Sequence, residues 1–216
     1  HLMDYFQNQL NTQFPDHQIF RGAPLGNEYT HGSKRYLWIF DPLDGVANVQ
    51  AGIPIWGISL ALVENFWPVC GAIFLPATGD EFQAVAGREA LRGDEVINTA
   101  SLDSVSDESV LLTYSRFHLQ YHTTFPGKIR NMGCTTAHIC YVAQGRADAA
   151  IIANESFQGL AAARVIIEAA GGKIYKMDGR EFFLNEYLDG GRINEHLLVT
   201  TPGICHQVLN TLNRTN

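Results

Sequence analysis

The segment WIFDPLDGVANVQAGIPIWGISLALVE, residues 38–64, decides the fold because it joins two apolar strands through a turn that carries acidic side chains. The aromatic and β-branched run at residues 36–40 predicts a buried strand that ends where the acidic turn begins. The apolar run at 58–63 predicts the next strand, and glycine and proline separate the two. We therefore expect chemistry at the D-P-L-D-G turn, residues 41–45.

Two carboxylates three residues apart form the centre of this turn. Asp41 and Asp44 flank Pro42, which restricts the backbone, and Gly45 permits a tight turn after them. Mg²⁺ commonly binds one or two carboxylates together with a substrate phosphate and water, so the pair is suited to half of a metal site. If Gly45 and Val46 begin a short helix, their backbone N–H groups would face the phosphate. The other interpretation is an aspartate-capped turn without a metal, because Asp and Gly are common turn residues.

Outside this segment, strands dominate the first half of the chain and helices alternate with strands in the second half. We expect a first helix at 3–14, further meander strands at 68–74 and 81–85, and a polar stretch at 101–108. In the second half, helices are expected at 135–144, 160–170 and 204–212, and strands at 110–113, 147–153, 173–176 and 197–200. This order predicts an α/β (α+β) sandwich with two lobes around a cleft: an N-terminal α+β lobe, 1–108, and a C-terminal α/β lobe, 109–216.

The composition predicts a soluble, cytoplasmic protein that binds neither nucleic acid nor membranes. A chain of 216 residues that is 46% apolar can bury a sizeable core. A net charge of -7 argues against nucleic acid, because binding to phosphate backbones needs clustered Lys and Arg. No apolar run approaches the roughly 18 residues of a membrane span. The four cysteines form no C-x-x-C pair, which is typical of a reducing compartment.

Four segments resemble the inositol monophosphatase family. Residues 38–64 are similar to its signature, in which an apolar strand enters D-P-[IL]-D-G-T-x-N-F. The resemblance continues in GAIFLPATGDEFQAVAGREALRGDEVI (71–97), RNMGCTTAHICYVAQGRADAA (130–150) and EAAGGKIYKMDG (168–179). Apart from about one helix at the family's usual N-terminus, it covers most of the chain. It implies a layered αβαβα sandwich of the inositol monophosphatase and fructose bisphosphatase type, Mg²⁺-dependent phosphomonoester hydrolysis and a homodimer.

Part of the family's metal site is retained in this sequence. Asp41 and Asp44 match the two motif aspartates, and Leu43 matches the position whose backbone carbonyl binds the metal. The resemblance therefore implies Asp41, Leu43 and Asp44 as metal ligands, with Asp41 and Asp44 as the catalytic pair if the protein is active.

Four family positions are lost. Ala23 and Pro24 stand where the family has two acidic residues, and Gly159 stands where it has a metal-binding aspartate. Val46 replaces a threonine that orients the attacking water, and valine cannot form that hydrogen bond. Removing three acidic groups removes most of the charge that gathers the cations, so we expect weak or absent Mg²⁺ binding and weak or lost hydrolysis.

Two functions remain open at this point. In the first, the protein binds a phosphorylated small molecule or a protein partner and has weak or no hydrolytic activity. The alternative is an active Mg²⁺-dependent phosphatase that acts on inositol phosphate, a sugar phosphate or a nucleotide-derived phosphate. The substituted positions favour the first function, and the retained pair Asp41 and Asp44 favours the second.

Several other side chains are candidates for the site. Glu155 lies four residues before Gly159 and is the nearest replacement ligand. Arg21 is either a partner of Asp41 or Asp44 in place of the metal, or a solvated loop arginine. Cys134 and His138 stand at i and i+4 of a predicted helix. That spacing is compatible with a zinc or nucleophile pair, but ordinary helix packing is the favoured interpretation.

Overall fold

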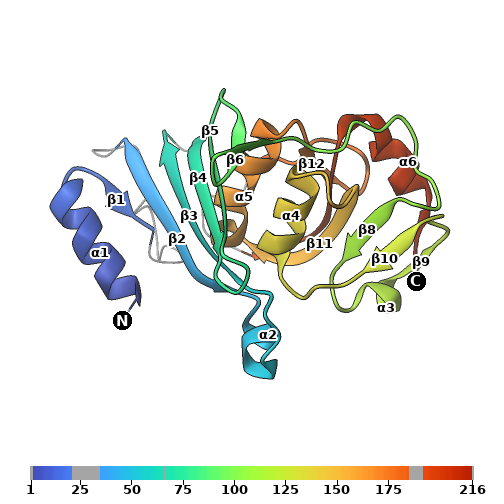
Figure 1. The fold of residues 1–216 in the computed structure, drawn as a ribbon, viewed down its shortest axis with the longest axis horizontal. Helices are drawn as coiled ribbons and strands as arrows, with labels where there is room; N and C mark the ends of the chain where they lie inside the picture. Colours follow the sequence, from blue (N-terminus) through green and yellow to red (C-terminus); the bar gives the residue numbers. More distant parts are fainter. Residues whose placement is uncertain (1, 21–34, 66, 185–191, 216) are drawn as a thin grey trace.

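Two sheets, each built from one half of the chain, lie on either side of a pair of helices, α4 (Thr135–Ala143) and α5 (Phe157–Ala169) (Figure 1). The structure is a computed structural model that describes residues 2–20, 35–65, 67–184 and 192–215. Further helices lie on the outer faces of the two sheets (Figure 1). This layering confirms the predicted α/β sandwich.

The first sheet is the predicted antiparallel meander. Its strands follow the order β1-β2-β3-β4-β5-β6-β7, and only the β1–β2 pair is parallel among the pairs described. Strand β2 continues to Asp44, beyond the predicted end at residue 40, because the acidic turn itself pairs with β3. The strands are β1 Gln18–Ile19, β2 Tyr36–Asp44, β3 Gly57–Glu64, β4 Trp67–Leu75, β5 Asp80–Val85, β6 Ala90–Arg92 and β7 Glu95–Ile97.

The second sheet has the order β10-β8-β11-β13-β12. Strands β10, β8 and β11 are parallel, so their carboxyl ends meet at one edge of the sheet, whereas β13 is antiparallel to β11 and β12. A separate two-stranded pair, β9 and β14, lies nearby (Figure 1). The strands are β8 Val110–Thr113, β9 Tyr121–Thr123, β10 Lys128–Arg130, β11 Ala149–Ser156, β12 Lys173–Lys176, β13 Arg192–Thr200 and β14 Leu212–Arg214.

Helix α5 packs closely on the first sheet because both surfaces carry small residues. A Cβ atom on Gly71 of β4 would lie 2.5 Å from the carbonyl oxygen of Ala162 in α5. Only glycine permits that approach.

Helix α5 begins three residues before its predicted start because the Ser156 Oγ accepts a 3.0 Å hydrogen bond from the Gly159 N–H. The other helices are α1 Leu2–Gln13, α2 Val46–Ala51, α3 Phe117–Gln120 and α6 Cys205–Asn210, the last preceded by a 3₁₀ turn, Pro202–Ile204.

The division into lobes at residue 108 stays a prediction. The strands of the first sheet lie within residues 18–97 and those of the second within 110–200, which matches the two proposed halves. The main hydrophobic core, however, contains buried residues from both halves. No helix in the described part of the chain combines the length and apolarity needed to cross a bilayer.

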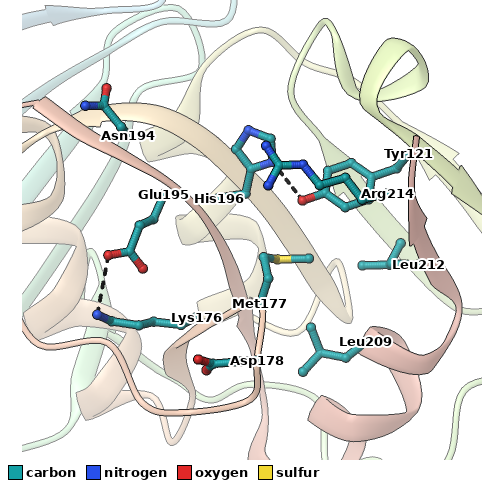
Figure 2. A pocket seen from close by; sticks show the side chains of 10 residues that line it. All are labelled: Tyr121, Lys176, Met177, Asp178, Asn194, Glu195, His196, Leu209, Leu212 and Arg214. Carbon is teal, nitrogen blue, oxygen red and sulfur yellow. Dashed lines mark hydrogen bonds and ion pairs between the residues drawn. The ribbon is translucent and has the colours of Figure 1, made fainter. Parts of the chain in front are cut away.

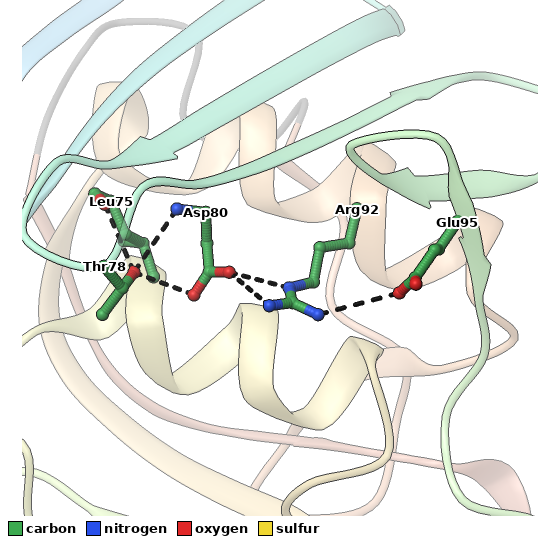
Figure 3. A network of polar contacts seen from close by, with 5 residues as sticks. All are labelled: Leu75, Thr78, Asp80, Arg92 and Glu95. Carbon is green, nitrogen blue, oxygen red and sulfur yellow. Dashed lines mark hydrogen bonds and ion pairs between the residues drawn. The ribbon is translucent and has the colours of Figure 1, made fainter.

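An ion pair joins β5 and β6, two neighbouring strands of the first sheet (Figure 3). Two nitrogens of Arg92, Nε and Nη2, each lie 2.7 Å from Asp80 Oδ1, and Thr78 Oγ1 donates to Asp80 Oδ2 at 2.8 Å. Burial opposes ionisation of Asp80, but hydrogen bonds from Thr78 and Arg92 and the charge of Arg92 bring its pKa below the ordinary value. Asp80 is therefore ionised and fastens β5 to β6.

Candidate functional site

A β-bulge sets the two predicted site aspartates on the same side of β2. Asp41 pairs with Ser59 and Asp44 pairs with Gly57, so three steps along β2 oppose two steps along β3. Side chains alternate along a regular strand, and residues three apart would point to opposite faces. The extra residue in the bulge brings both carboxylates together.

The pKa of Asp41 reflects this proximity. Burial raises the pKa of Asp41, the 3.2 Å hydrogen bond from the Leu43 N–H to Asp41 Oδ1 opposes the rise, and the charge of Asp44 adds to it. The structure thus places Asp41, Leu43 and Asp44 together in the bulged end of β2, and the prediction that these residues form a turn is wrong. Their function as metal ligands stays a prediction.

Gly45 follows β2 and caps the short helix α2, the helix that phosphate binding by Gly45 and Val46 would require. Its φ is +86°, and a Cβ atom would lie 3.0 Å from the carbonyl oxygen of Ile55, so glycine is required here. Asn48 and Val49 donate their backbone N–H groups to the Gly45 carbonyl. The Val46 side chain is half exposed and offers no hydrogen bond. That Gly45 and Val46 bind phosphate stays a prediction.

Asp44 lies at the beginning of helix α4. Its Oδ2 atom accepts a 2.7 Å hydrogen bond from the Thr136 N–H and faces the Cys134 sulfur at 3.3 Å. Burial, with the charge of Asp44 adding to it, raises the pKa of Cys134 to about 12. Cys134 is therefore a neutral thiol that donates to Asp44, and the positive end of α4 stabilises the carboxylate.

Glu155 supplies a third carboxyl group. A Cβ atom on Gly159 would lie 3.5 Å from Glu155 Oε2 and 3.6 Å from Asp41 Oδ2, so both carboxyl groups flank this glycine. Thr135 Oγ1 donates to Glu155 Oε1 at 2.6 Å. Burial raises the pKa of Glu155 to about 8 despite that bond, and the charges of Asp44 and Asp41 contribute. Glu155 is consequently protonated for the most part at neutral pH.

Gly159 occupies the first turn of α5, buried among these carboxyl groups. A longer side chain at this position would extend toward Glu155 and Asp41. The position that the resemblance assigns to a metal-binding aspartate therefore belongs to the same site, and glycine supplies no ligand there.

Within the described residues, the donor set does not fit a site for several metal ions. Asp44 Oδ2 already accepts from Thr136 N–H and faces the Cys134 thiol, and Glu155 carries a proton at neutral pH. Asp41, Asp44 and Glu155 lie within electrostatic reach of one another. Even so, among the residues that the structure describes, no group of three or more His, Cys, Asp or Glu is arranged to hold a metal ion. Arg21, Ala23 and Pro24 lie outside the described residues.

His138 packs inside the molecule and does not pair with Cys134. Its Nε2 accepts a 3.1 Å hydrogen bond from the Met132 N–H, and burial lowers the pKa of His138 to about 4. The imidazole is neutral and its acceptor is satisfied. Helix packing, the favoured interpretation of this pair, agrees with these contacts.

Sequence reasoning missed Thr135 and Thr136. They donate to Glu155 and Asp44 respectively, and so link the beginning of α4 to both acidic segments. The signal in the sequence was a pair of adjacent threonines at the predicted start of a helix. The first backbone N–H groups of a helix have no partner within the helix, so they can donate to groups elsewhere.

A cavity of about 470 Å³ between β12, β13 and β14 contains charged side chains that already have partners (Figure 2). Lys176 Nζ lies 3.4 Å from Glu195 Oε1, and the Tyr121 hydroxyl lies 2.7 Å from His196 Nδ1. Asp178, also in the lining, pairs with Arg180 at 2.7 Å. Because Lys176, Glu195 and Asp178 are already paired, we do not place the chemistry here.

Replacing Glu155 with glutamine is expected to flatten the dependence of stability on pH. The folded protein keeps a proton on Glu155 up to about pH 8, whereas the unfolded chain loses it near 4.5, so the folded state loses stability as pH rises between these values. In the glutamine variant, the loss of stability between these pH values should be smaller by about 2–4 kcal/mol, a figure that allows for partial exposure of Glu155. Urea unfolding at pH 5 and pH 8 measures the difference in the free energy of unfolding between the two pH values. The exposed Glu89→Gln is the control, and an unchanged pH dependence in Glu155→Gln would contradict the buried-acid assignment.

Comparison with known proteins agrees with the fold. The profile of the Inositol monophosphatase family matches residues 2–210. Nus factor SuhB of Xylella fastidiosa is 30% identical over 80% of this chain and 65% of its own length. Fructose-1,6-bisphosphatase/inositol-1-monophosphatase of Aquifex aeolicus is 28% identical over 83% of this chain and 70% of its own. The solved structure of the Thermotoga maritima IMPase superposes with a TM-score of 0.79 at 25% identity, over 97% of this chain and 79% of that one. The chain belongs to the inositol monophosphatase family.

Proposed function

We propose that this protein binds a phosphorylated small molecule at the Asp41–Asp44 site and hydrolyses phosphate esters weakly or not at all. The observation that carries the proposal is the position of Gly159. A Cβ atom there would lie 3.6 Å from Asp41 Oδ2 and 3.5 Å from Glu155 Oε2, so an acidic side chain would start beside both carboxyl groups, but glycine has none.

The electrostatics of the site support weak Mg²⁺ binding. With Glu155 protonated at neutral pH, the described cluster relies on Asp41 and Asp44 for its negative charge. A metal's stabilisation of developing charge contributes several kcal/mol to phosphate-ester hydrolysis, and each ~1.4 kcal/mol is a factor of ten in rate. Weak occupancy of the Asp41–Asp44 site by Mg²⁺ would therefore lower the rate of hydrolysis steeply.

A phosphate group still finds favourable partners here. Helices α4 and α5 both begin at the site, at Cys134 and Ser156, and helix N-termini favour anions. A protonated Glu155 is also a hydrogen-bond donor to a phosphate oxygen. These groups support binding in which this chain's own residues orient the ligand.

An active Mg²⁺-dependent phosphatase is the second candidate, and Glu155 is the observation that favours it. Its carboxyl group approaches the position that the family's aspartate would fill, and a bound cation favours the ionised form of a neighbouring acid. Asp41, Asp44, the Leu43 carbonyl and Glu155 would then hold the metal, which would polarise the phosphate and activate water.

Phosphate release from a panel of monoesters at several Mg²⁺ concentrations separates the two candidates. We expect turnover in the intact protein to stay close to that of Asp44→Asn at every Mg²⁺ concentration. The exposed Asp107→Asn is the matched control. Metal-dependent turnover that Asp44→Asn lowers by roughly a hundredfold or more, and Asp107→Asn leaves unchanged, would establish the active phosphatase instead.

A homodimer and a cytoplasmic location are further parts of the proposal. Helix α2 projects from the body of the molecule (Figure 1). Helix α2 and the loop that follows it expose the apolar side chains of Val46, Val49 and Ile53. Exposed apolar side chains gathered in one projecting segment favour contact with a second copy of the chain.

A further inference from the structure

The registers of two strand pairs gather polar and apolar side chains around the cavity of about 470 Å³ shown in Figure 2, which we call the Arg214 cavity. Arg214 of β14 lies directly opposite Tyr121 of β9, and opposite residues of an antiparallel pair project from the same face. Leu212 shares that face because side chains alternate along a strand. Asn194 and His196, two residues apart on β13, also line the cavity. Three strands thus contribute to one lining.

Part of this lining is apolar. Met177, Leu209 and Leu212 are half-buried side chains that pack against a hydrophobic core containing Tyr121. Figure 2 shows the three of them gathered below the rings of Tyr121 and His196. Covering their exposed parts with a ligand is favourable, and the volume is within the range of pockets that hold small molecules. This part of the cavity favours an apolar or aromatic body.

The charges of the lining leave one cation without a charged partner. Lys176 pairs with Glu195, and Asp178 pairs with Arg180, which lies outside the lining. Within the described residues, no ion pair and no side-chain hydrogen bond involves the Arg214 guanidinium. A guanidinium has five N–H donors. Arg214 therefore offers both a positive charge and donors to a ligand.

The groups beside Arg214 do not neutralise it. Burial raises the pKa of Tyr121 and lowers the pKa of His196, and the positive charge of Arg214 lowers the pKa of both groups. No carboxylate contributes to either shift. Tyr121 and His196 are consequently uncharged at neutral pH, and the tyrosine hydroxyl lies 2.7 Å from His196 Nδ1. An anion beside Arg214 would meet neutral polar groups there.

We propose that the Arg214 cavity binds a small carboxylic acid with an apolar or aromatic body, a ligand separate from the phosphate ester of the Asp41–Asp44 site. Arg214 binds the carboxylate because a guanidinium forms paired hydrogen bonds with it. The body of the ligand covers the three apolar side chains. Binding at this cavity requires neither Mg²⁺ nor hydrolysis.

The charge of the cavity suits a carboxylate better than a phosphate. A carboxylate carries one negative charge, which Arg214 matches. A phosphate monoester carries close to two at neutral pH. Its second charge would face a lining that also contains Glu195 and Asp178, whose cations are already engaged.

An NMR titration of the full chain, with EDTA present to remove divalent cations, tests the inference with three ligands that share a phenyl ring. Phenylacetate carries a carboxylate, benzyl phosphate carries a phosphate, and 2-phenylethanol is the neutral counterpart of phenylacetate. We expect phenylacetate to bind roughly ten- to hundredfold more tightly than phenylethanol and more tightly than benzyl phosphate. Equal affinity for the acid and the alcohol would overturn the inference, and tighter binding of benzyl phosphate would overturn the assignment to a carboxylate.

The methionine methyl groups locate the bound ligand, because the chain has three methionines and one of them, Met177, lines the cavity. Phenylacetate should shift the ¹³C-methyl signal of Met177. Met132 lies two residues before Cys134, which faces Asp44, and its signal should stay in place. A shift of Met132 without a shift of Met177 would place the ligand at the Asp41–Asp44 site and would contradict the proposal.

Variants assign the charge preference to Arg214. Arg214→Gln should bring the ratio of the affinities for phenylacetate and phenylethanol close to one, and Arg214→Lys should keep part of the preference. Arg116→Gln removes an exposed arginine that does not line the cavity, and this matched control should keep the full ratio. An unchanged ratio in Arg214→Gln, or equal losses in Arg214→Gln and Arg116→Gln, would rule out Arg214 as the anchor.

Discussion

Replacing Gly159 with aspartate is expected to raise the affinity for Mg²⁺ by roughly ten- to hundredfold. The new carboxylate would start from a Cβ position 3.6 Å from Asp41 Oδ2 and 3.5 Å from Glu155 Oε2. These separations are ordinary van der Waals contacts, and the Ser156 Oγ at 3.3 Å needs only a small shift. A further acidic ligand beside Asp41 supplies the oxygen and the negative charge that the described cluster lacks.

The Gly159→Asp variant has a second measurable consequence. Without a cation, the added charge repels Asp41 and lowers the melting temperature, and Mg²⁺ should restore it through preferential binding to the folded state. Calorimetry and thermal melts with and without Mg²⁺ measure both effects. Gly159→Asn, which has a similar size and no charge, is the matched control. Equal Mg²⁺ affinity in the aspartate and asparagine variants would mean that charge at this position does not limit metal binding.

Replacing Arg164 with methionine is expected to lower the free energy of unfolding by about 3 kcal/mol. Arg164 lies in α5, and its side chain is 8% exposed. Nη1 donates to the Phe182 carbonyl, and Nη2 pairs with Glu168 and lies 3.7 Å from Glu181. Methionine fills much of the volume but leaves the Phe182 carbonyl and the Glu168 carboxylate without the cation, whereas Glu181 keeps Lys173 at 2.6 Å. The cost is therefore mainly that of the unpaired polar groups.

Urea unfolding at pH 7 measures this loss, and the exposed Arg88→Met provides the control, with an expected change within about 0.5 kcal/mol. A loss no larger than that of the control would show that the α5 arginine is dispensable.

The sequence was sufficient to predict the layered fold and the centre of the site. The alternating apolar runs predicted the meander, and the D-P-L-D-G turn predicted where two carboxylates lie together. Both depend on local patterns: the period of a strand and the turn chemistry of Asp, Pro and Gly. The short elements β6, β7, β9, β10, β14 and α3 have three or four residues each, too few to show a period.

The details of the site depend on contacts between distant segments, which no local pattern contains. Glu155 was a candidate from its position alone, but its raised pKa arises from burial beside Asp44 and Asp41, more than a hundred residues earlier in the chain. The hydrogen bonds from Thr135 and Thr136 likewise exist only once α4 lies against the acidic turn.

The single extra residue between Asp41 and Asp44 makes the site sensitive to chain length as well as to side-chain identity. Insertion of one residue into β3 between Gly57 and Ser59 would restore regular pairing with β2 and turn one of the two carboxylates to the opposite face, although every acidic residue would still be present. A count of retained acidic residues therefore overlooks one way in which related chains can gain or lose this arrangement. Their alignments around Ile58, as well as around Pro42 and Leu43, should be compared for insertions and deletions as closely as for substitutions.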